Sequence, residues 1–328
     1  MSFTSLIIQD RDLAFLTTLI ESRALTAQHA AILHFGGSKE AAKKRLQKLK
    51  AAGLITERKR RASEPSVLSL APKAFPLLKE RGLLASYPSL SGASLQSRAK
   101  VSDLTLAHEL EVMDVKSAFY GALKGSKRFT IAEFTTWPLL NQFEARRSGQ
   151  SAEAMTVKPD GSIKIHEHES NGGILEHTFF LEVDRSSESL DTLVTKASCY
   201  LDYYKSGGYA LRNGGTRLDF KDYPFRVLMI CKTAERRNNV AERLLQHVPP
   251  ILTQVCLATL KDVVANPLQA FWIRPREYYE AAKDTPYDTS RTAGNWQFRR
   301  HGAREIFVED HVRKIRISSR RHPLPHYE

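Results

Sequence analysis

Cysteine, long apolar segments and acidic residues are all scarce in this 328-residue chain. Its only cysteines, Cys199, Cys231 and Cys256, lie far apart in apolar surroundings, so we expect buried thiols rather than disulfides or zinc ligands. No apolar run approaches the ~20 residues of a membrane-spanning helix. The first ten residues lack the pattern of a signal peptide. We therefore expect a cytoplasmic protein with no membrane partner.

Basic residues outnumber acidic ones and are concentrated at the two ends of the chain. The formal net charge is +13, and it divides into +10 over residues 1–100, −2 over 101–290 and +5 over 291–328. Basic ends around a near-neutral centre indicate a polyanionic partner, for which double-stranded DNA is the best candidate. The length suits two domains, and 42% hydrophobic residues are typical of globular proteins.

The first ninety residues have the pattern of a winged helix-turn-helix. Capping residues and apolar spacing predict helices over 10–21, 27–34 and 39–52, and then two short strands, 54–60 and 66–70. A helix over 72–84 would close this unit. In a winged helix the third helix enters the major groove, and the strand hairpin contacts the DNA backbone beside it.

The third predicted helix and the hairpin are rich in basic residues. Lysines mostly contact phosphates, and side chains that read bases bidentately are scarce here, so no DNA sequence preference can be derived. The alternative is a solvated basic helix beside an incidental hairpin. The residues expected to contact DNA are Lys39, Lys43, Lys44, Lys48, Arg58, Lys59, Arg60 and Arg61.

A second region, after a Ser-rich linker over 86–102, has the pattern of an α/β fold. A helix is predicted over 103–123, with Glu111 on the apolar stripe formed by Leu104, Ala107, Val115, Ala118 and Ala122. A strand over 129–137 contains Glu133. A hairpin arm over 157–165 would turn at Asp160-Gly161. The alternating residues His166 to Glu169, with His177, read as a solvated hairpin tip.

The next predicted strand, 178–184, is apolar except for Glu182 and Asp184. Side chains alternate along a strand, so these two acids point to the same face, where they are tolerable if a metal ion, a cation or water neutralises them. On the following helix, 188–205, Lys196 and Tyr200 are four residues apart and face the same way. A buried strand over 225–231, a helix over 235–247 and strands near 255–257 and 271–273 complete an α/β core.

Three short motifs in this region carry a resemblance. Pro159-Asp160, Glu182-Val183-Asp184 and Lys196-x-x-x-Tyr200 resemble the PD-(D/E)xK nuclease superfamily. The whole chain resembles the replication-relaxation family of plasmids and other mobile elements. This resemblance implies a winged helix over 1–85, a linker over 86–102, a restriction-endonuclease-like mixed-sheet α/β domain over 103–285 and a basic extension over 286–328.

The resemblance also implies roles for single residues. Asp160 and Glu182 would bind Mg²⁺, with the Val183 carbonyl as a third ligand. Asp184 stands where the nuclease motif has a lysine, so Lys196 would supply that cation. Asp184 would then be a second metal ligand or the partner of Lys196. Glu111 matches the first-helix acid by position, with Glu133 as the alternative.

The resemblance implies a DNA-binding protein of a plasmid or mobile element that controls replication, relaxation or mobilisation through its winged helix. Its nuclease-like half would be degenerate, with Glu182 and Asp184 paired with Arg185 and Lys196. The alternative is a Mg²⁺-dependent DNA endonuclease or nickase that uses Asp160, Glu182 and Lys196. A protein-interaction scaffold is a third reading. Expected partners are double-stranded DNA, a second copy of the chain and plasmid replication or mobilisation proteins.

Overall fold

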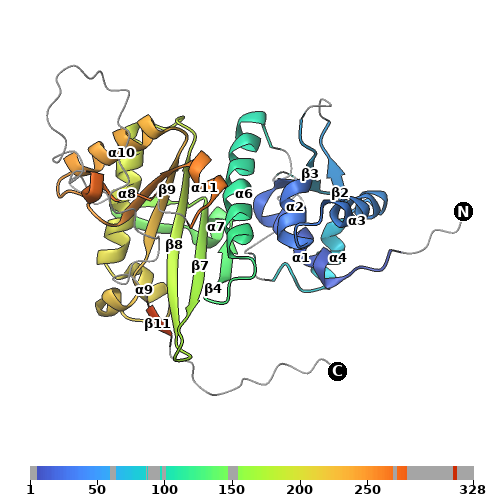
Figure 1. Cartoon of the computed structure of the whole chain (residues 1–328), viewed down its shortest axis with the longest axis horizontal. Coiled ribbons are helices and arrows are strands. Elements are labelled where there is room, and N and C mark those ends of the chain that lie inside the picture. The colour runs from blue at the N-terminus through green and yellow to red at the C-terminus, as the bar shows by residue number, and fades with distance from the viewer. Residues whose placement is uncertain are drawn as a thin grey trace, which may run out of the picture.

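The computed structural model shows two packed units with one long helix between them. It describes residues 6–59, 64–85, 87, 97, 101–146, 154–268, 272–278 and 313–315. The amino-terminal unit lies on one side of helix α6 (Asp103–Leu123), and a β-sheet lies on the other side (Figure 1). Within these ranges, no helix is long and apolar enough to cross a membrane.

In the described residues, the amino-terminal unit contains the helices α1 to α4 and a small antiparallel sheet of order β1-β3-β2. Its helices follow the predicted positions closely because Thr26 and Ser38 cap α2 and α3 through the backbone N–H groups of His29 and Ala41. Strand β1 was not predicted, since three residues show no pattern. The elements are α1 (Asp10–Ser22), β1 (Ala24–Thr26), α2 (Ala27–His34), α3 (Lys39–Ala51), β2 (Ile55–Glu57), β3 (Val67–Leu70) and α4 (Ala74–Glu80).

The second unit is built on a mixed sheet of order β10-β9-β8-β7-β4, and this confirms the α/β prediction. Strands β8, β9 and β10 are parallel, whereas β4, β7 and β8 pair antiparallel. Strand β11 (Arg313–Ile315) pairs with the start of β8. The other strands are β4 (Phe129–Thr135), β5 (Phe143–Arg146), β6 (Ala154–Val157), β7 (Gly161–His168), β8 (Ile174–Asp184), β9 (Arg226–Cys231) and β10 (Val255–Thr259).

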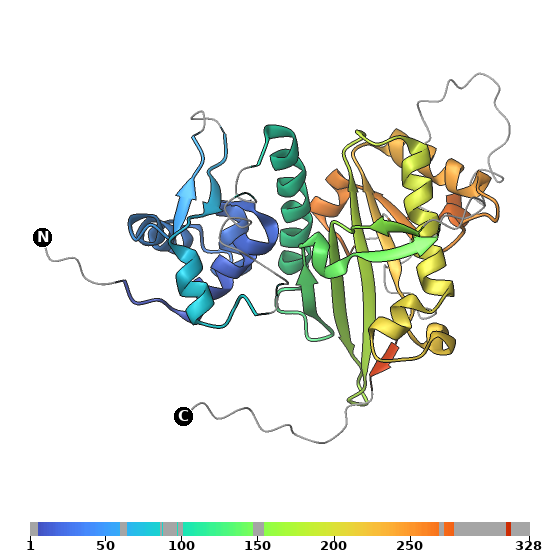
Figure 2. The same ribbon diagram turned by 180° about the vertical axis from the view of Figure 1, so that it is seen from behind.

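Helices cover both faces of the large sheet (Figure 2). One face packs against α6 and α11, around Phe119, Ile163 and Leu181. The other packs against α8 and α10, around Phe180 and Tyr200. The remaining helices are α7 (Pro138–Asn141), α8 (Leu190–Lys205), α9 (Gly208–Arg212), the 3₁₀ helix η1 (Arg217–Asp222), α10 (Ala234–Gln246) and α11 (Leu260–Ala265).

Helix α6 is buried on two sides rather than along the single predicted stripe. Val115 and Phe119 pack against the sheet, whereas Met113 belongs to the core of the amino-terminal unit. Leu104, predicted to be buried, is 72% exposed. The stripe prediction was therefore wrong, and the reason is that α6 contacts two cores instead of one. The expected domain boundaries stay a prediction.

An ion pair and a hydrogen bond join α6 to the amino-terminal unit. Nζ of the buried Lys116 lies 3.6 Å from Glu21 and donates to the Phe134 carbonyl. Nε2 of His29 lies 2.7 Å from Asp114. Burial lowers the pKa of Lys116, and the Glu21 carboxylate opposes that shift. Burying a charge without a partner destabilises the fold, so these contacts fix the position of α6 against the amino-terminal unit.

Two local predictions in the sheet were wrong. Asp160-Gly161 is no hairpin turn: β6 pairs with β5, β7 pairs with β8, and Asp160 lies in the connection between β6 and β7. His166 to His168 lie within β7 rather than at a solvated tip. His177 is buried, with Nε2 2.8 Å from Glu167. Most of residues 86–100 and of the predicted basic tail lie outside the described residues.

Lys116→Met tests whether the buried pair of Lys116 and Glu21 holds α6 against the amino-terminal unit. Removing the ammonium leaves the Glu21 carboxylate without its cation, so we expect a loss of ~3 kcal/mol in the free energy of unfolding. Urea denaturation followed by circular dichroism measures this loss. Lys205→Met, an exposed lysine of α8, is the control. Equal stability of the two variants would contradict a structural role for Lys116.

Candidate functional site

The acids predicted from sequence lie at the carboxyl end of β8, on the face that packs against α8 and α10. Glu182 is 2% exposed and Asp184 5% exposed. Both side chains point to the same face, as strand alternation requires. A carboxylate is stable at this depth only when ion pairs or hydrogen bonds compensate its charge. The partners of each acid therefore determine what the site can do.

Glu182 is held by two residues of α8. The Tyr200 hydroxyl donates to Oε1 at 2.6 Å, and the Lys196 ammonium donates to Oε2 at 3.1 Å. Lys196 also donates to Glu188 at 2.9 Å. Burial raises the pKa of Glu182 to about 7, although the charge of Lys196 opposes this shift. Burial lowers the pKa of Lys196, but the carboxylates of Glu182 and Glu188 outweigh that effect and raise it above its ordinary value.

Asp160 links β8 to α6. Its Oδ2 accepts a hydrogen bond from the backbone N–H of Val183 at 2.7 Å, and its Oδ1 lies 2.9 Å from Nε2 of His108. Burial alone would lower the pKa of His108, but the hydrogen bond and charge of Asp160 raise it above its ordinary value. The charge of Asp160 also raises the pKa of Glu182, so the two carboxylates interact electrostatically. No sequence motif pointed to His108.

Asp184 belongs to a different ion pair. The Arg236 side chain, at the start of α10, donates through Nε to Oδ2 at 2.7 Å. The backbone N–H of Ser186 donates to Oδ1 at 2.9 Å. Asp184 is therefore the partner of Arg236 and not of Lys196. Ser186 has a positive φ of 64°, a strained conformation that often occurs next to functional sites.

The other candidate acids have separate partners. Glu111 lies 3.0 Å from Nε of Arg185, and Glu133 lies 3.1 Å from Lys164 on β7. The structure thus brings together three of the candidate residues, Asp160, Glu182 and Lys196. Asp184 and Glu111 lie in neighbouring ion pairs, and Glu133 pairs elsewhere.

The arrangement does not fit Mg²⁺ as it stands. Carboxylate oxygens are the right donors for this ion. However, every carboxylate oxygen of Asp160 and Glu182 already contacts a protein donor or the imidazole of His108. In the described ranges, no three His, Cys, Asp or Glu side chains lie close enough together to bind a metal. A divalent ion at this pair would have to share these oxygens with their present partners or displace one of them, and the ammonium of Lys196 would repel it.

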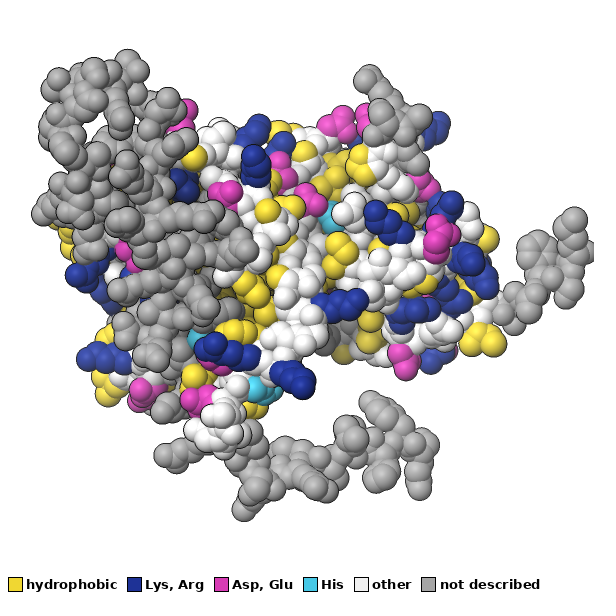
Figure 3. All heavy atoms as spheres, in the orientation of Figure 1, with side chains coloured by type: hydrophobic (Ala, Val, Ile, Leu, Met, Phe, Trp, Pro, Cys, Tyr) yellow, Lys and Arg dark blue, Asp and Glu magenta, His cyan; other side chains and the backbone are white. Residues whose placement is uncertain are grey.

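A second candidate surface is the exposed side of α3. Its opposite side packs into the core through Ala42, Leu46 and Leu49. Figure 3 shows Lys and Arg side chains gathered over the end of the molecule that contains α3. On this exposed side of α3, four lysines have no hydrogen bond or ion pair with the described residues, namely Lys39, Lys43, Lys44 and Lys48.

Other basic residues of α3 and of the hairpin that follows it are already paired. Arg45 pairs with the buried Asp12, and Lys50 lies 2.5 Å from Glu57. Arg58 pairs with Asp103 and donates to the Val101 carbonyl, so it joins the hairpin to the start of α6. Lys59 is exposed, and its contact with DNA stays a prediction. Arg60 and Arg61 lie outside the described residues.

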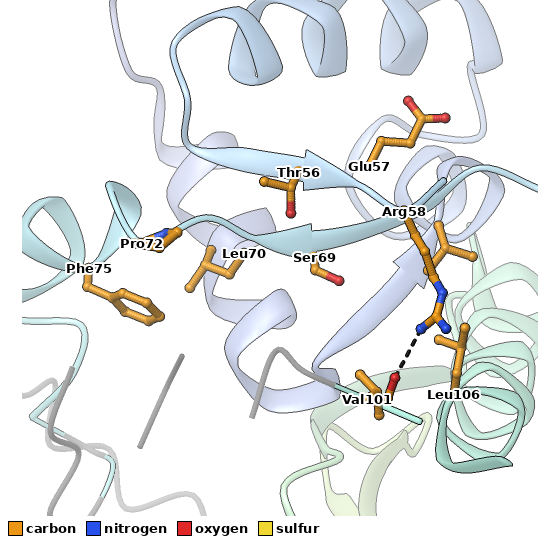
Figure 4. Close-up of a pocket in the computed structure, with 10 residues that line it drawn as sticks. Thr56, Glu57, Arg58, Ser69, Leu70, Pro72, Phe75, Val101 and Leu106 are labelled. Carbon is orange, nitrogen blue, oxygen red and sulfur yellow. Dashed lines mark hydrogen bonds between the residues drawn. The ribbon is translucent and has the colours of Figure 1, made fainter. Parts of the chain in front are cut away.

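A pocket of about 350 Å³ lies between the hairpin and the start of α6 (Figure 4). Thr56 and Ser69 line it from β2 and β3, and Leu106 lines it from α6. The Arg58 side chain extends across it to Val101. None of the candidate acids lines this pocket, so it is separate from the carboxylate site.

Comparison with known proteins gives one match. The profile of the family described as Replication-relaxation matches residues 16–218. This stretch is more than half of the chain, and it contains α3, His108, Asp160, Glu182 and Lys196. No curated protein and no solved structure matches the chain.

Lys196→Met tests whether the ammonium excludes divalent ions from the carboxylate pair. The substitution frees one oxygen of Glu182 and removes the positive charge that would repel a divalent ion, so we expect tighter Mn²⁺ binding than in the wild type. Titration calorimetry measures the affinity, and Lys205→Met is the matched control. Wild-type protein that binds Mn²⁺ as tightly as the variant would show that Lys196 does not compete with the ion.

Proposed function

The chain belongs to the replication-relaxation family, and from this premise we propose that it is a DNA-binding protein that controls replication, relaxation or mobilisation of a plasmid or other mobile element. The observation that carries the proposal is the row of exposed, uncompensated lysines on α3. Plasmid replication or mobilisation proteins and a second copy of the chain stay predicted partners.

The position of α3 supports the proposal. It is the third helix of the unit, and a short antiparallel hairpin, β2–β3, follows it. In a winged helix-turn-helix, this helix enters the major groove and the hairpin contacts the neighbouring backbone. Lysine ammonium groups bind phosphates as point charges, so the surface favours backbone contacts that are independent of base sequence.

The carboxylate site supports a non-cleaving role. Its acids are compensated in pairs, namely Asp160 with His108, Glu182 with Lys196 and Asp184 with Arg236. These pairs join α6, α8 and α10 to the carboxyl end of β8, the central strand of the sheet. We infer that the nuclease-like half holds the DNA-binding unit in place and presents it to other partners.

Replacing Lys43 and Lys44 by glutamine tests the DNA-binding surface. Each lost phosphate contact should reduce the slope of log K against log salt by about 0.9. Fluorescence anisotropy with a labelled mixed-sequence duplex, measured over a series of salt concentrations, gives this slope. Lys205→Gln should leave it unchanged. A double variant with the wild-type slope would rule out this face of α3 as the DNA-binding surface.

A second candidate function is metal-dependent DNA cleavage. One observation favours it: Asp160, Glu182 and Lys196 lie together, as the resemblance to PD-(D/E)xK nucleases implies. Each carboxylate oxygen of Asp160 and Glu182 already has a partner, so the ion would have to share these oxygens or displace a partner such as Lys196.

Supercoiled plasmid incubated with the protein and Mn²⁺ separates the two functions. A non-cleaving protein leaves the plasmid supercoiled, and this is the expected result. Nicking by the wild type that disappears in both Asp160→Ala and Glu182→Ala would establish the nuclease function instead. Nicking that persists in both variants would indicate a contaminating enzyme.

A further inference from the structure

The turn that connects α6 to β4 is strongly basic. Its five residues, 124–128, read Lys-Gly-Ser-Lys-Arg and include no acid. Gly125 has a φ of +76°, which allows the chain to reverse directly after α6. The Ser126 hydroxyl accepts a hydrogen bond from the backbone N–H of Phe129 at 3.1 Å and so fixes the turn at the start of β4. We call residues 124–128 the basic turn.

The basic turn lies directly beside the connection between α2 and α3. The Lys124 ammonium donates to the Gly36 carbonyl at 2.6 Å, and a Cβ on Gly37 would lie 4.0 Å from that ammonium. Ser38 follows and caps α3, and Lys39 is the first residue of this helix. A cation from the second unit therefore lies within a few residues of the α3 lysines.

The basic turn adds uncompensated positive charge to this region. Lys124 is exposed, and the one hydrogen bond of its ammonium with the described residues is to a neutral carbonyl. Lys127 is also exposed and has no hydrogen bond or ion pair among the described residues. Arg128 differs, because it pairs with Glu167 at 2.6 Å. Lys124 and Lys127 are thus the two residues of the turn whose positive charge is not compensated by an acid among the described residues.

We propose that the basic turn is a second phosphate-binding element that extends the α3 surface onto the second unit. The proposal rests on DNA binding by α3. When a helix-turn-helix is bound, the first helix crosses the DNA backbone while the recognition helix enters the groove. A lysine beside the turn between these helices is placed to contact the phosphates that flank that groove. DNA affinity then depends on residues of both units.

The surroundings favour a nucleic acid over a protein partner. Protein interfaces generally have an apolar core enclosed by polar residues. None of the large exposed apolar side chains of the described chain belongs to α3 or to the basic turn, and only Ile7, whose carbonyl accepts from Arg45 at 2.6 Å, is hydrogen-bonded to α3. These exposed apolar residues are Ile7, Leu104, Leu139, Leu211, Leu218, Val248, Leu252 and Val264. Isolated lysines without such a core suit a polyanion whose charges repeat at short intervals.

The test compares Lys124→Gln, Lys127→Gln and their combination with the control Lys205→Gln, all in the full chain. Affinity for a labelled mixed-sequence duplex is measured by anisotropy over a series of salt concentrations. Each single variant should reduce the salt slope by about 0.9, and the double variant should reduce it by about twice as much. Lys127 has no internal bond to lose, so its effect cannot come from loosening the α2–α3 connection.

Each of the other outcomes overturns the proposal. Salt slopes equal to that of the wild type in both single variants, while Lys43→Gln/Lys44→Gln lowers the slope, would refute the basic turn but leave DNA binding by α3 intact. A loss confined to Lys124→Gln would also refute it, since that pattern indicates a displaced turn between α2 and α3. Wild-type protein that fails to bind DNA would overturn the proposed function and the basic turn together.

Discussion

The burial of α6 on two opposite sides is the constraint from which the rest of the structure follows. One side of the helix completes the core of the sheet through Val115 and Phe119, and another completes the amino-terminal core through Met113. Lys116 is buried with it and pairs with Glu21. A helix with two such sides cannot shift along either neighbour without exposing apolar surface or separating a buried ion pair. The two units are therefore held in one relative position.

This position also organises the carboxylate site. His108 on α6 reaches Asp160, and Asp160 accepts the backbone N–H of Val183. The carboxyl end of β8, which contains Glu182, is thus attached to α6, the helix that also contacts the amino-terminal unit. Glu182 is buried, yet it retains two strong partners, Lys196 and Tyr200. The ammonium of Lys196 thus supplies the positive charge that compensates the buried Glu182 carboxylate.

The sequence was most informative where structure depends on local chemistry. Helix α2 follows a capping threonine, and it occupies the residues predicted for it. The shared face of Glu182 and Asp184 follows from strand alternation alone. Contacts between residues far apart in the sequence could not be predicted from local patterns. His108 is separated from Asp160 by 52 residues, and Arg236 from Asp184 by the same number. The stripe predicted for α6 was wrong for a related reason, because one sequence pattern cannot show that a helix has two neighbours.

Net charge alone does not identify the surface that binds DNA, because many basic residues in the amino-terminal unit are already paired. Arg45 and Lys50 are next to α3 lysines in sequence, yet their charge is compensated by Asp12 and Glu57. Several acids of the second unit are also paired, such as Glu182 with Lys196 and Asp184 with Arg236. The uncompensated lysines of α3 and of the basic turn supply the positive charge of the proposed DNA-binding surface. In the proposed complex, the position of the duplex depends on which charges remain unpaired, rather than on how many the chain contains.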